Sequence, residues 1–378
     1  MPPDCSVHVR PNRCLNSNYR FIECRHCADC CPRSAVRIVE NTPVIEENLC
    51  SVCGACTTAC QTGAIERQDY CEENLVRMAI RSEGKRVVLF CGRHQEPVRR
   101  GSRGELVCLQ TDSCLAEISE TALFEIGLNN LAELAVDRCR DCPDGANLGQ
   151  ILDHIDRANE LLRTVGRKQA VCAREEPGEE RGLRRQRAVS TGRPELSRRE
   201  TLLRLLDGGK QMVLGNIAID PFSSGAKQNR EVCRAEWKDR LVPIYREAWE
   251  KAEEHGESAR WPSVRMESGC TECGLCARSC AAEALQIVQQ EGELIHLYRP
   301  MLCVGCRSCE HVCPKQIVSV RLEKTDKPFV ARAVFRTKAI RCRSCGKLTI
   351  PNETGLCHWC AGKPSADDMK NALRRRLG

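Results

Sequence analysis

The sequence predicts an α+β protein in which two cysteine-rich modules flank a small α/β domain and a short tail with paired cysteines follows. Three observations support this fold class. The chain of 378 residues contains 30 cysteines but only 4% aromatic residues. Cysteine runs of similar spacing recur after a gap of about two hundred residues, as in an internal repeat. Between the runs, short apolar segments alternate with helical patterns, which is typical of a parallel sheet.

So many cysteines are typical either of a disulfide-bonded secreted protein or of a metal protein in a reducing compartment. The amino-terminal residues show no basic segment followed by an apolar run, and no stretch of the sequence is apolar enough to span a membrane. We therefore expect a cytoplasmic protein whose cysteines bind metal. Metal binding would also supply folding free energy that the small apolar core lacks.

The second cysteine-rich module, residues 263–330, carries two runs of the form Cys-x2-Cys-x2-Cys-x3-Cys, the later one followed by proline. The module closely resembles bacterial two-cluster ferredoxins, which implies two [4Fe–4S] clusters, with the last cysteine of each run serving the other cluster. One cluster would use Cys270, Cys273, Cys276 and Cys313, and the other would use Cys303, Cys306, Cys309 and Cys280. Between the runs, residues 285–288 and 293–297 predict a hairpin that turns at residues 291 and 292.

The first module, residues 1–75, resembles the same family but departs from it at one ligand. Its earlier run reads Cys24-x2-Cys27-x2-Cys30-Cys31-Pro, and aligning Cys31 with the usual Cys-Pro puts Phe21 where a cysteine would stand. We expect one cluster at Cys31, Cys50, Cys53 and Cys56, and a second at Cys24, Cys27, Cys60 and Cys14. Two alternatives stay open. Cys30 could be the fourth ligand in place of Cys14, or the fourth ligand could be missing, which would give a three-iron cluster.

Residues 84–170 alternate short apolar runs with helical patterns at residues 114–128 and 146–162. The apolar runs read as strands of a parallel sheet, whose carboxyl ends share one edge. We expect four strand-end cysteines to converge there, with Cys114 nearby: Cys91, Cys108, Cys139 and Cys142. This order resembles the delta subunit of methyl-viologen-reducing hydrogenase, which implies a fifth iron–sulfur cluster. A structural domain with reduced cysteines and a thiol redox site stay open as alternatives.

The remaining segments are a charged linker and a compact tail. Residues 171–262 are expected to be a linker with helices at residues 201–206 and 229–254. Residues 338–365 show two Cys-x2-Cys pairs with zinc-ribbon spacing, which predicts one structural Zn²⁺. Its ligands would be Cys342, Cys345, Cys357 and Cys360, although a rubredoxin-like iron stays open. Residues 366–378 read as a basic, solvated tail.

These motifs predict a multi-cluster electron-transfer subunit of a cytoplasmic redox complex. Its partner would be a catalytic subunit with flavin, molybdenum, tungsten or nickel, or a soluble electron carrier. No dinucleotide fingerprint or phosphate-binding loop is found in the sequence, so we assign no catalytic residue. The formal net charge of +7 does not indicate nucleic-acid binding, because the thiolates of four clusters and one zinc would add roughly −10. A sulfur or disulfide reductase, and an iron–sulfur sensor or assembly factor, stay open.

Overall fold

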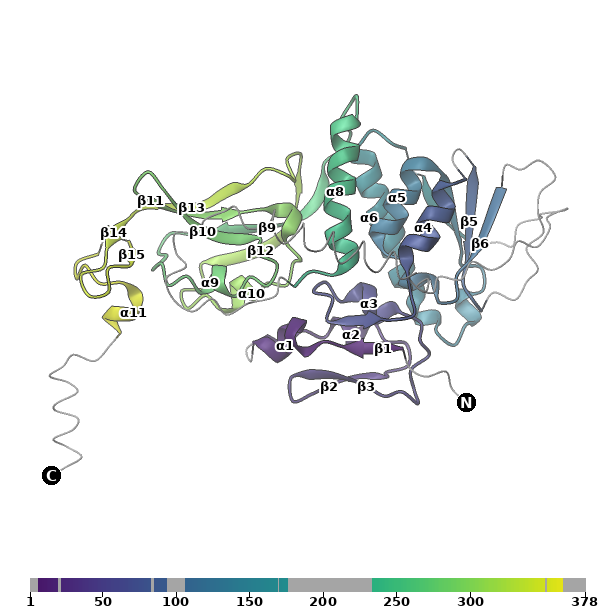
Figure 1. The fold of residues 1–378 in the computed structure, drawn as a ribbon, viewed down its shortest axis with the longest axis horizontal. Coiled ribbons are helices and arrows are strands. Elements are labelled where there is room, and N and C mark those ends of the chain that lie inside the picture. The colour runs from purple at the N-terminus through teal and green to yellow at the C-terminus, as the bar shows by residue number, and fades with distance from the viewer. Residues whose placement is uncertain are drawn as a thin grey trace, which may run out of the picture.

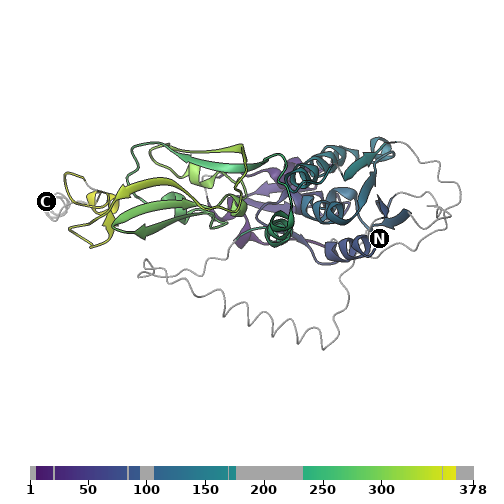
Figure 2. The ribbon, with the colours of Figure 1, turned by 90° about the horizontal axis from the view of Figure 1, so that it is seen from above.

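The computed structural model describes residues 6–19, 22–82, 85–93, 106–168, 170–175, 233–350 and 352–362. The two cysteine-rich modules lie beside each other, the middle domain packs on the first module, and the tail extends from the far end of the second (Figures 1 and 2). The helix expected at residues 201–206 and the basic tail at residues 366–378 lie outside the described residues.

The first module is built from short elements because its cysteine loops take up most of the chain. Strand β1 (Val7–Val9) pairs with β4 (Ile65–Arg67), and β2 (Val36–Val39) forms a hairpin with β3 (Thr42–Ile45). The helices are η1 (Pro11–Arg13), α1 (Leu15–Asn18), α2 (His26–Asp29) and α3 (Ala55–Ala59). Cysteines complete its small apolar core, where Cys27 and Cys56 pack with valine and isoleucine side chains of the strands.

The second module repeats this plan with longer strands. Strand β9 (Ala259–Met266) pairs with β12 (Val318–Thr325), and β10 (Leu285–Gln290), β11 (Glu293–Tyr298) and β13 (Arg332–Lys338) form a second sheet. The helices are α9 (Leu275–Arg278), η5 (Pro300–Leu302) and α10 (Ser308–His311). The expected hairpin is confirmed, because Glu291 and Gly292 join β10 to β11 with φ angles of 50° and 80°, as a type I′ turn requires.

The middle domain contains the expected parallel sheet, with strand order β6 (Leu106–Gln110), β5 (Arg86–Phe90), β7 (Leu131–Ala135) and β8 (Val171–Arg174). Its longer helices are α4 (Glu72–Ile80), α5 (Glu120–Asn129) and α6 (Leu148–Thr164). Three short turns of helix, η2 (Leu115–Glu117), η3 (Cys139–Asp141) and η4 (Gly145–Asn147), follow strands β6 and β7. Strand β8 lies in the segment expected to be linker, so the sheet extends past residue 170.

Helix α8 (Glu236–Lys251) stands between the second module and the middle domain (Figure 1). It is three residues shorter at each end than the described part of the helix expected at residues 229–254. Its Tyr245 is fully buried, with ring centroids of Phe124, Trp261 and Phe329 at 5.6, 5.7 and 5.2 Å. The Tyr245 hydroxyl lies 2.8 Å from Thr164 Oγ1. These contacts join α5 and α6 of the middle domain to β9 of the second module.

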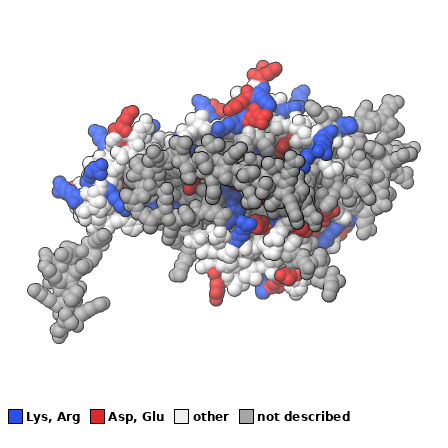
Figure 3. Space-filling view, in the orientation of Figure 1, with Lys and Arg blue, Asp and Glu red and all other residues white. Residues whose placement is uncertain are grey.

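The tail consists of β14 (Ile340–Arg341), β15 (Leu348–Thr349) and α11 (His358–Ala361). It contacts the second module through Trp359, whose Nε1 donates a hydrogen bond to the carbonyl oxygen of Cys273 at 3.1 Å. Basic and acidic side chains are interspersed over the described part of the surface in Figure 3. Among the described residues, no helix combines the length and the apolar character that crossing a membrane requires.

Candidate metal centres

One cavity of the second module is lined by the four cysteines that the spacing assigned to a single cluster. These are Cys270, Cys273, Cys276 and Cys313, which we call site D. The Glu272 backbone, at φ 52°, donates its N–H to Cys270 Sγ at 3.4 Å. Buried His296 lies with Nδ1 3.8 Å from Cys276 Sγ and Nε2 2.8 Å from Glu272 Oε1. Donors directed at sulfur favour thiolates, so these residues fit an iron–sulfur cluster.

The other four cysteines of this module form a second group, which we call site C. Its members are Cys280, Cys303, Cys306 and Cys309. Burial raises the pKa of Cys309, and the thiols of Cys303, Cys306 and Cys280 raise it further. The backbone N–H groups of Leu285 and Gly305 donate to Cys280 Sγ and Cys303 Sγ, both at 3.4 Å. Four clustered cysteines, two of which accept backbone N–H bonds, fit a metal cluster, whose binding would release the protons of their thiols.

In the first module, a cavity is lined by Cys31, Cys50, Cys53 and Cys56, which we call site A. The Ala35 N–H donates to Cys31 Sγ at 3.2 Å. Burial raises the pKa of Cys56 well above its ordinary value, and the Cys30 thiol contributes ahead of the thiols of site A itself. Cys30 therefore lies close to site A and also close to Cys27, toward whose carbonyl its thiol donates at 3.5 Å.

A larger cavity of about 580 Å³ is lined by Cys14, Cys24, Cys27 and Cys60, which we call site B. Burial raises the pKa of Cys27 to about 12, with further contributions from Cys60, Cys24 and Cys14. Asn16 on α1 holds the Cys24 loop, because its side chain both donates to and accepts from the Cys24 backbone at 2.6 Å. Cys14 is one of the described residues that line this cavity, whereas Cys30 is not. The geometry thus favours Cys14 as the fourth ligand.

The middle domain has a cavity of about 300 Å³ at the carboxyl edge of its sheet, which we call the middle cavity. It is lined by Cys91 after β5, Cys114 after β6, and Cys139 and Cys142 after β7. Burial raises the pKa of Cys139 to about 12, and the thiols of Cys114, Cys91 and Cys142 add to the shift. Four converging thiols fit a small iron–sulfur cluster, and the site lies where the strand order reverses.

The expectation for Cys108 was wrong. Cys108 lies within β6, opposite Val88 in the register, where it packs with Val88, Phe90 and Ala135 and does not line the cavity. Strand β6 continues to Gln110, so the cysteine that follows this strand is Cys114. The apolar run continues through Leu109, which could have shown that the strand does not end at Cys108.

Neighbouring sites share walls across the module boundaries. Cys53 of site A also lines the middle cavity, and Cys306 of site C also lines the cavity of site B. Beside the first boundary, Arg67 Nη1 donates a buried hydrogen bond to Glu117 Oε2 at 2.6 Å. The sites therefore follow one another in the order middle cavity, A, B, C and D.

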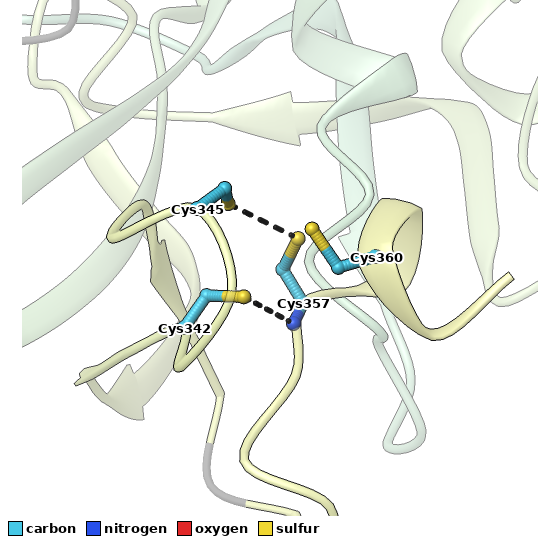
Figure 4. Close-up of side chains that lie close together, drawn as sticks. All are labelled: Cys342, Cys345, Cys357 and Cys360. Atoms are coloured by element: carbon cyan, nitrogen blue, oxygen red, sulfur yellow. Dashed lines mark hydrogen bonds between the residues drawn. The ribbon is translucent and has the colours of Figure 1, made fainter. Parts of the chain in front are cut away.

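The tail brings Cys342, Cys345, Cys357 and Cys360 together, with their sulfur atoms all within 4.8 Å of one another (Figure 4). The Cys357 N–H donates to Cys342 Sγ at 3.2 Å, and the sulfurs of Cys345 and Cys357 are 3.7 Å apart. The backbone N–H groups of Cys345 and Cys357 lower the pKa of Cys342 to about 6. A thiolate at neutral pH among three further thiols fits a four-coordinate metal site.

Comparison with known proteins finds 4Fe-4S domains in both cysteine-rich modules. Residues 269–317 match the 4Fe-4S dicluster domain, and residues 43–66 match the 4Fe-4S binding domain. Ferredoxin Fdx2 of Sorangium cellulosum (strain So ce56) is 32% identical over 73 residues, which cover 17% of this chain and 68% of that protein. The first match contains every cysteine of sites C and D, and the second contains Cys50, Cys53, Cys56 and Cys60. The chain therefore belongs to the ferredoxin family of iron–sulfur electron-transfer proteins.

Proposed function

We propose that the chain relays electrons along a row of iron–sulfur sites, from the middle cavity through sites A, B and C to site D. The main support for this proposal is that single cysteines line two neighbouring sites that belong to different modules. Cys53 belongs to site A and lines the middle cavity, while Cys306 belongs to site C and lines the cavity of site B. A storage protein would not need its sites in such a continuous order.

The cofactors of this relay would be one [4Fe–4S] cluster at each of sites A to D. A fifth iron–sulfur cluster would use Cys91, Cys114, Cys139 and Cys142 in the middle cavity. The tail cysteines would hold one Zn²⁺ with a structural role, since all four positions are thiolates and no position stays open for a substrate.

The relay would serve as a non-catalytic subunit of a cytoplasmic redox complex. Its two ends are the middle cavity and site D, so a catalytic partner and an electron carrier would meet the chain at opposite ends. The partner would carry the cofactor on which the chemistry takes place, such as flavin, molybdenum, tungsten or nickel.

Metal analysis of the full chain, purified without oxygen, tests this proposed set of cofactors. We expect about sixteen iron and sixteen sulfide per chain from sites A to D, further iron from the middle cavity, and about one zinc. Spin quantification after reduction checks that the iron is present as separate clusters. Fewer than about sixteen iron atoms in fully loaded protein would refute the four-cluster relay.

A second candidate function is sulfur or disulfide reduction in the middle cavity. Its volume of about 300 Å³ and its wall of cysteines favour a small sulfur-containing ligand, while Arg93 and Arg138 are balanced by three aspartates of the same wall. The variants Cys139→Ser and Cys142→Ser separate the two functions. Loss of a cluster signal with altered electron flow supports the relay, and loss of turnover with every cluster signal intact supports the reductase.

A further inference from the structure

A short extended segment, residues 233–235, ties the two cysteine-rich modules together and is called here the bridging segment. The Cys233 N–H donates to the Ala281 carbonyl at 2.9 Å, and the Ala235 N–H donates to the Gln61 carbonyl at 3.0 Å. Gln61 follows Cys60 of site B, and Ala281 follows Cys280 of site C. The bridging segment thus connects the backbone beside site B directly to the backbone beside site C.

Side chains reinforce this connection. Arg234 donates to the Ala282 carbonyl at 2.7 Å, and Arg13 donates to the Arg234 carbonyl at 2.8 Å. The bridging segment also passes close over Gly63, where an added Cβ would lie 3.0 Å from Ala235 Cα. Gly63 has a φ of 64°, so both its conformation and the close approach require glycine. The separation of sites B and C is therefore fixed by many contacts.

Helix α8 begins directly after the bridging segment, and its first turn carries a buried lysine. Lys238 is 7% exposed, and its Nζ lies 3.3 Å from Gln61 Oε1, beside site B. Burial lowers the pKa of Lys238, Glu120 raises it, Arg157 lowers it further, and Cys303 of site C raises it. The Lys238 N–H donates to Ala235 of the bridging segment, which contacts the backbone beside both sites, so the lysine lies close to site B and to site C.

We propose that Lys238 is a positioning residue that places a buried positive charge between sites B and C, where it stabilises the reduced states of both clusters. The inference rests on the proposed function, because both sites must hold clusters. A cluster with four thiolates is negatively charged, and it gains a further negative charge on reduction. In the step concerned, one electron leaves the cluster at one site and enters the cluster at the other. No bond forms or breaks, and the nearby ammonium favours the added electron.

The expected size of the effect follows from Coulomb's law. At a separation of about 10 Å and an effective dielectric constant of about 20, one charge changes the reduction equilibrium roughly tenfold. For a one-electron couple, a tenfold change corresponds to about 59 mV in midpoint potential. Neutralising Lys238 should therefore lower the potentials of sites B and C by about this amount and leave site D, at the far side of its module, nearly unchanged.

The test is an anaerobic redox titration of the full chain, followed by electron paramagnetic resonance. It compares Lys238→Gln and Lys238→Met with Lys238→Arg, and with Lys251→Gln at the exposed end of the same helix. Chains with Cys14→Ser or Cys306→Ser assign the signals of sites B and C. We expect a drop of about 59 mV at these two sites in both neutral variants, and wild-type potentials in Lys238→Arg and Lys251→Gln.

Unchanged potentials in the neutral variants, with full iron and sulfide content, would overturn the proposal while leaving the relay intact. Wild-type protein without iron at site B or site C would instead refute the proposed function. If the neutral variants lose iron and Lys238→Arg keeps it, the charge is needed for both clusters to bind, which supports the proposal. If Lys238→Arg loses iron as well, the lysine acts only through packing, and the proposal is wrong.

Discussion

Replacing Cys14 by serine should remove iron from site B and leave the other sites loaded. Cys14 is buried at 8% exposure and lines the cavity with Cys24, Cys27 and Cys60. Its loss leaves three thiolates for a cluster that binds through four. We expect the iron content to fall from the wild-type value by about one atom if a three-iron cluster remains, or by about four if the cluster is lost.

Cys30→Ser is the matched control, because Cys30 is the competing fourth ligand but does not line the cavity of site B, whose four cysteines remain. Iron and sulfide would be counted per chain after anaerobic reconstitution, and the cluster type would be read from the paramagnetic resonance spectra of oxidised and reduced samples. We expect the control to retain its full iron. Loss of iron in Cys30→Ser together with full iron in Cys14→Ser would show that the ligand assignment for site B is wrong.

Three further predictions concern stability and the tail. Tyr245→Phe removes the hydroxyl that lies 2.8 Å from Thr164 Oγ1, so the free energy of unfolding in urea should fall by about 1 kcal/mol; an unchanged value would contradict this. Burial raises the pKa of Glu117 from 4.5 to about 8. The folded chain then holds this proton more tightly than the unfolded chain, so stability should fall as the pH rises from 4.5 to 8. Unfolding titrations of Glu117→Gln should show a weaker dependence on pH. A zinc chelator should expose residues 340–362 to proteolysis without changing the paramagnetic signals of sites A to D, and loss of those signals would contradict a separate tail site.

Much of the fold could be predicted because its signals are local. Alternating apolar residues identified β10 and β11, and the turn at Glu291 and Gly292 follows from residue type. The parallel sheet followed from the alternation of strands and helices. Strand β8 was missed because four residues carry little periodicity, and its place in the sheet is decided by pairing with β7. The packing of Tyr245 between two domains depends on contacts distant in sequence.

The candidate sites show the same difference between features set by local sequence and features set by tertiary contacts. Cysteine spacing alone grouped the members of site D, because a tight loop around a cluster fixes the intervals along the chain. It did not decide between Cys14 and Cys30, since Cys14 lies outside the regular motif and Cys30 stands in it beside Cys31. Cys108 was chosen over Cys114 because the end of β6 depends on pairing with β5. Nothing in the sequence indicated that Lys238 lies between two sites, because burial of a lysine follows from tertiary packing.

The pairing of β1 with β4 bears on how the chain is made. Val7 pairs with Arg67, so the strands of the first module close without any residue of the second module. Every cysteine of sites A and B has been synthesised by residue 60. In the second module, β9 cannot pair until β12 has been synthesised, because Ala259 pairs with Thr325. The clusters that we propose for sites A and B could therefore be inserted during translation, before the residues that connect the modules have been synthesised.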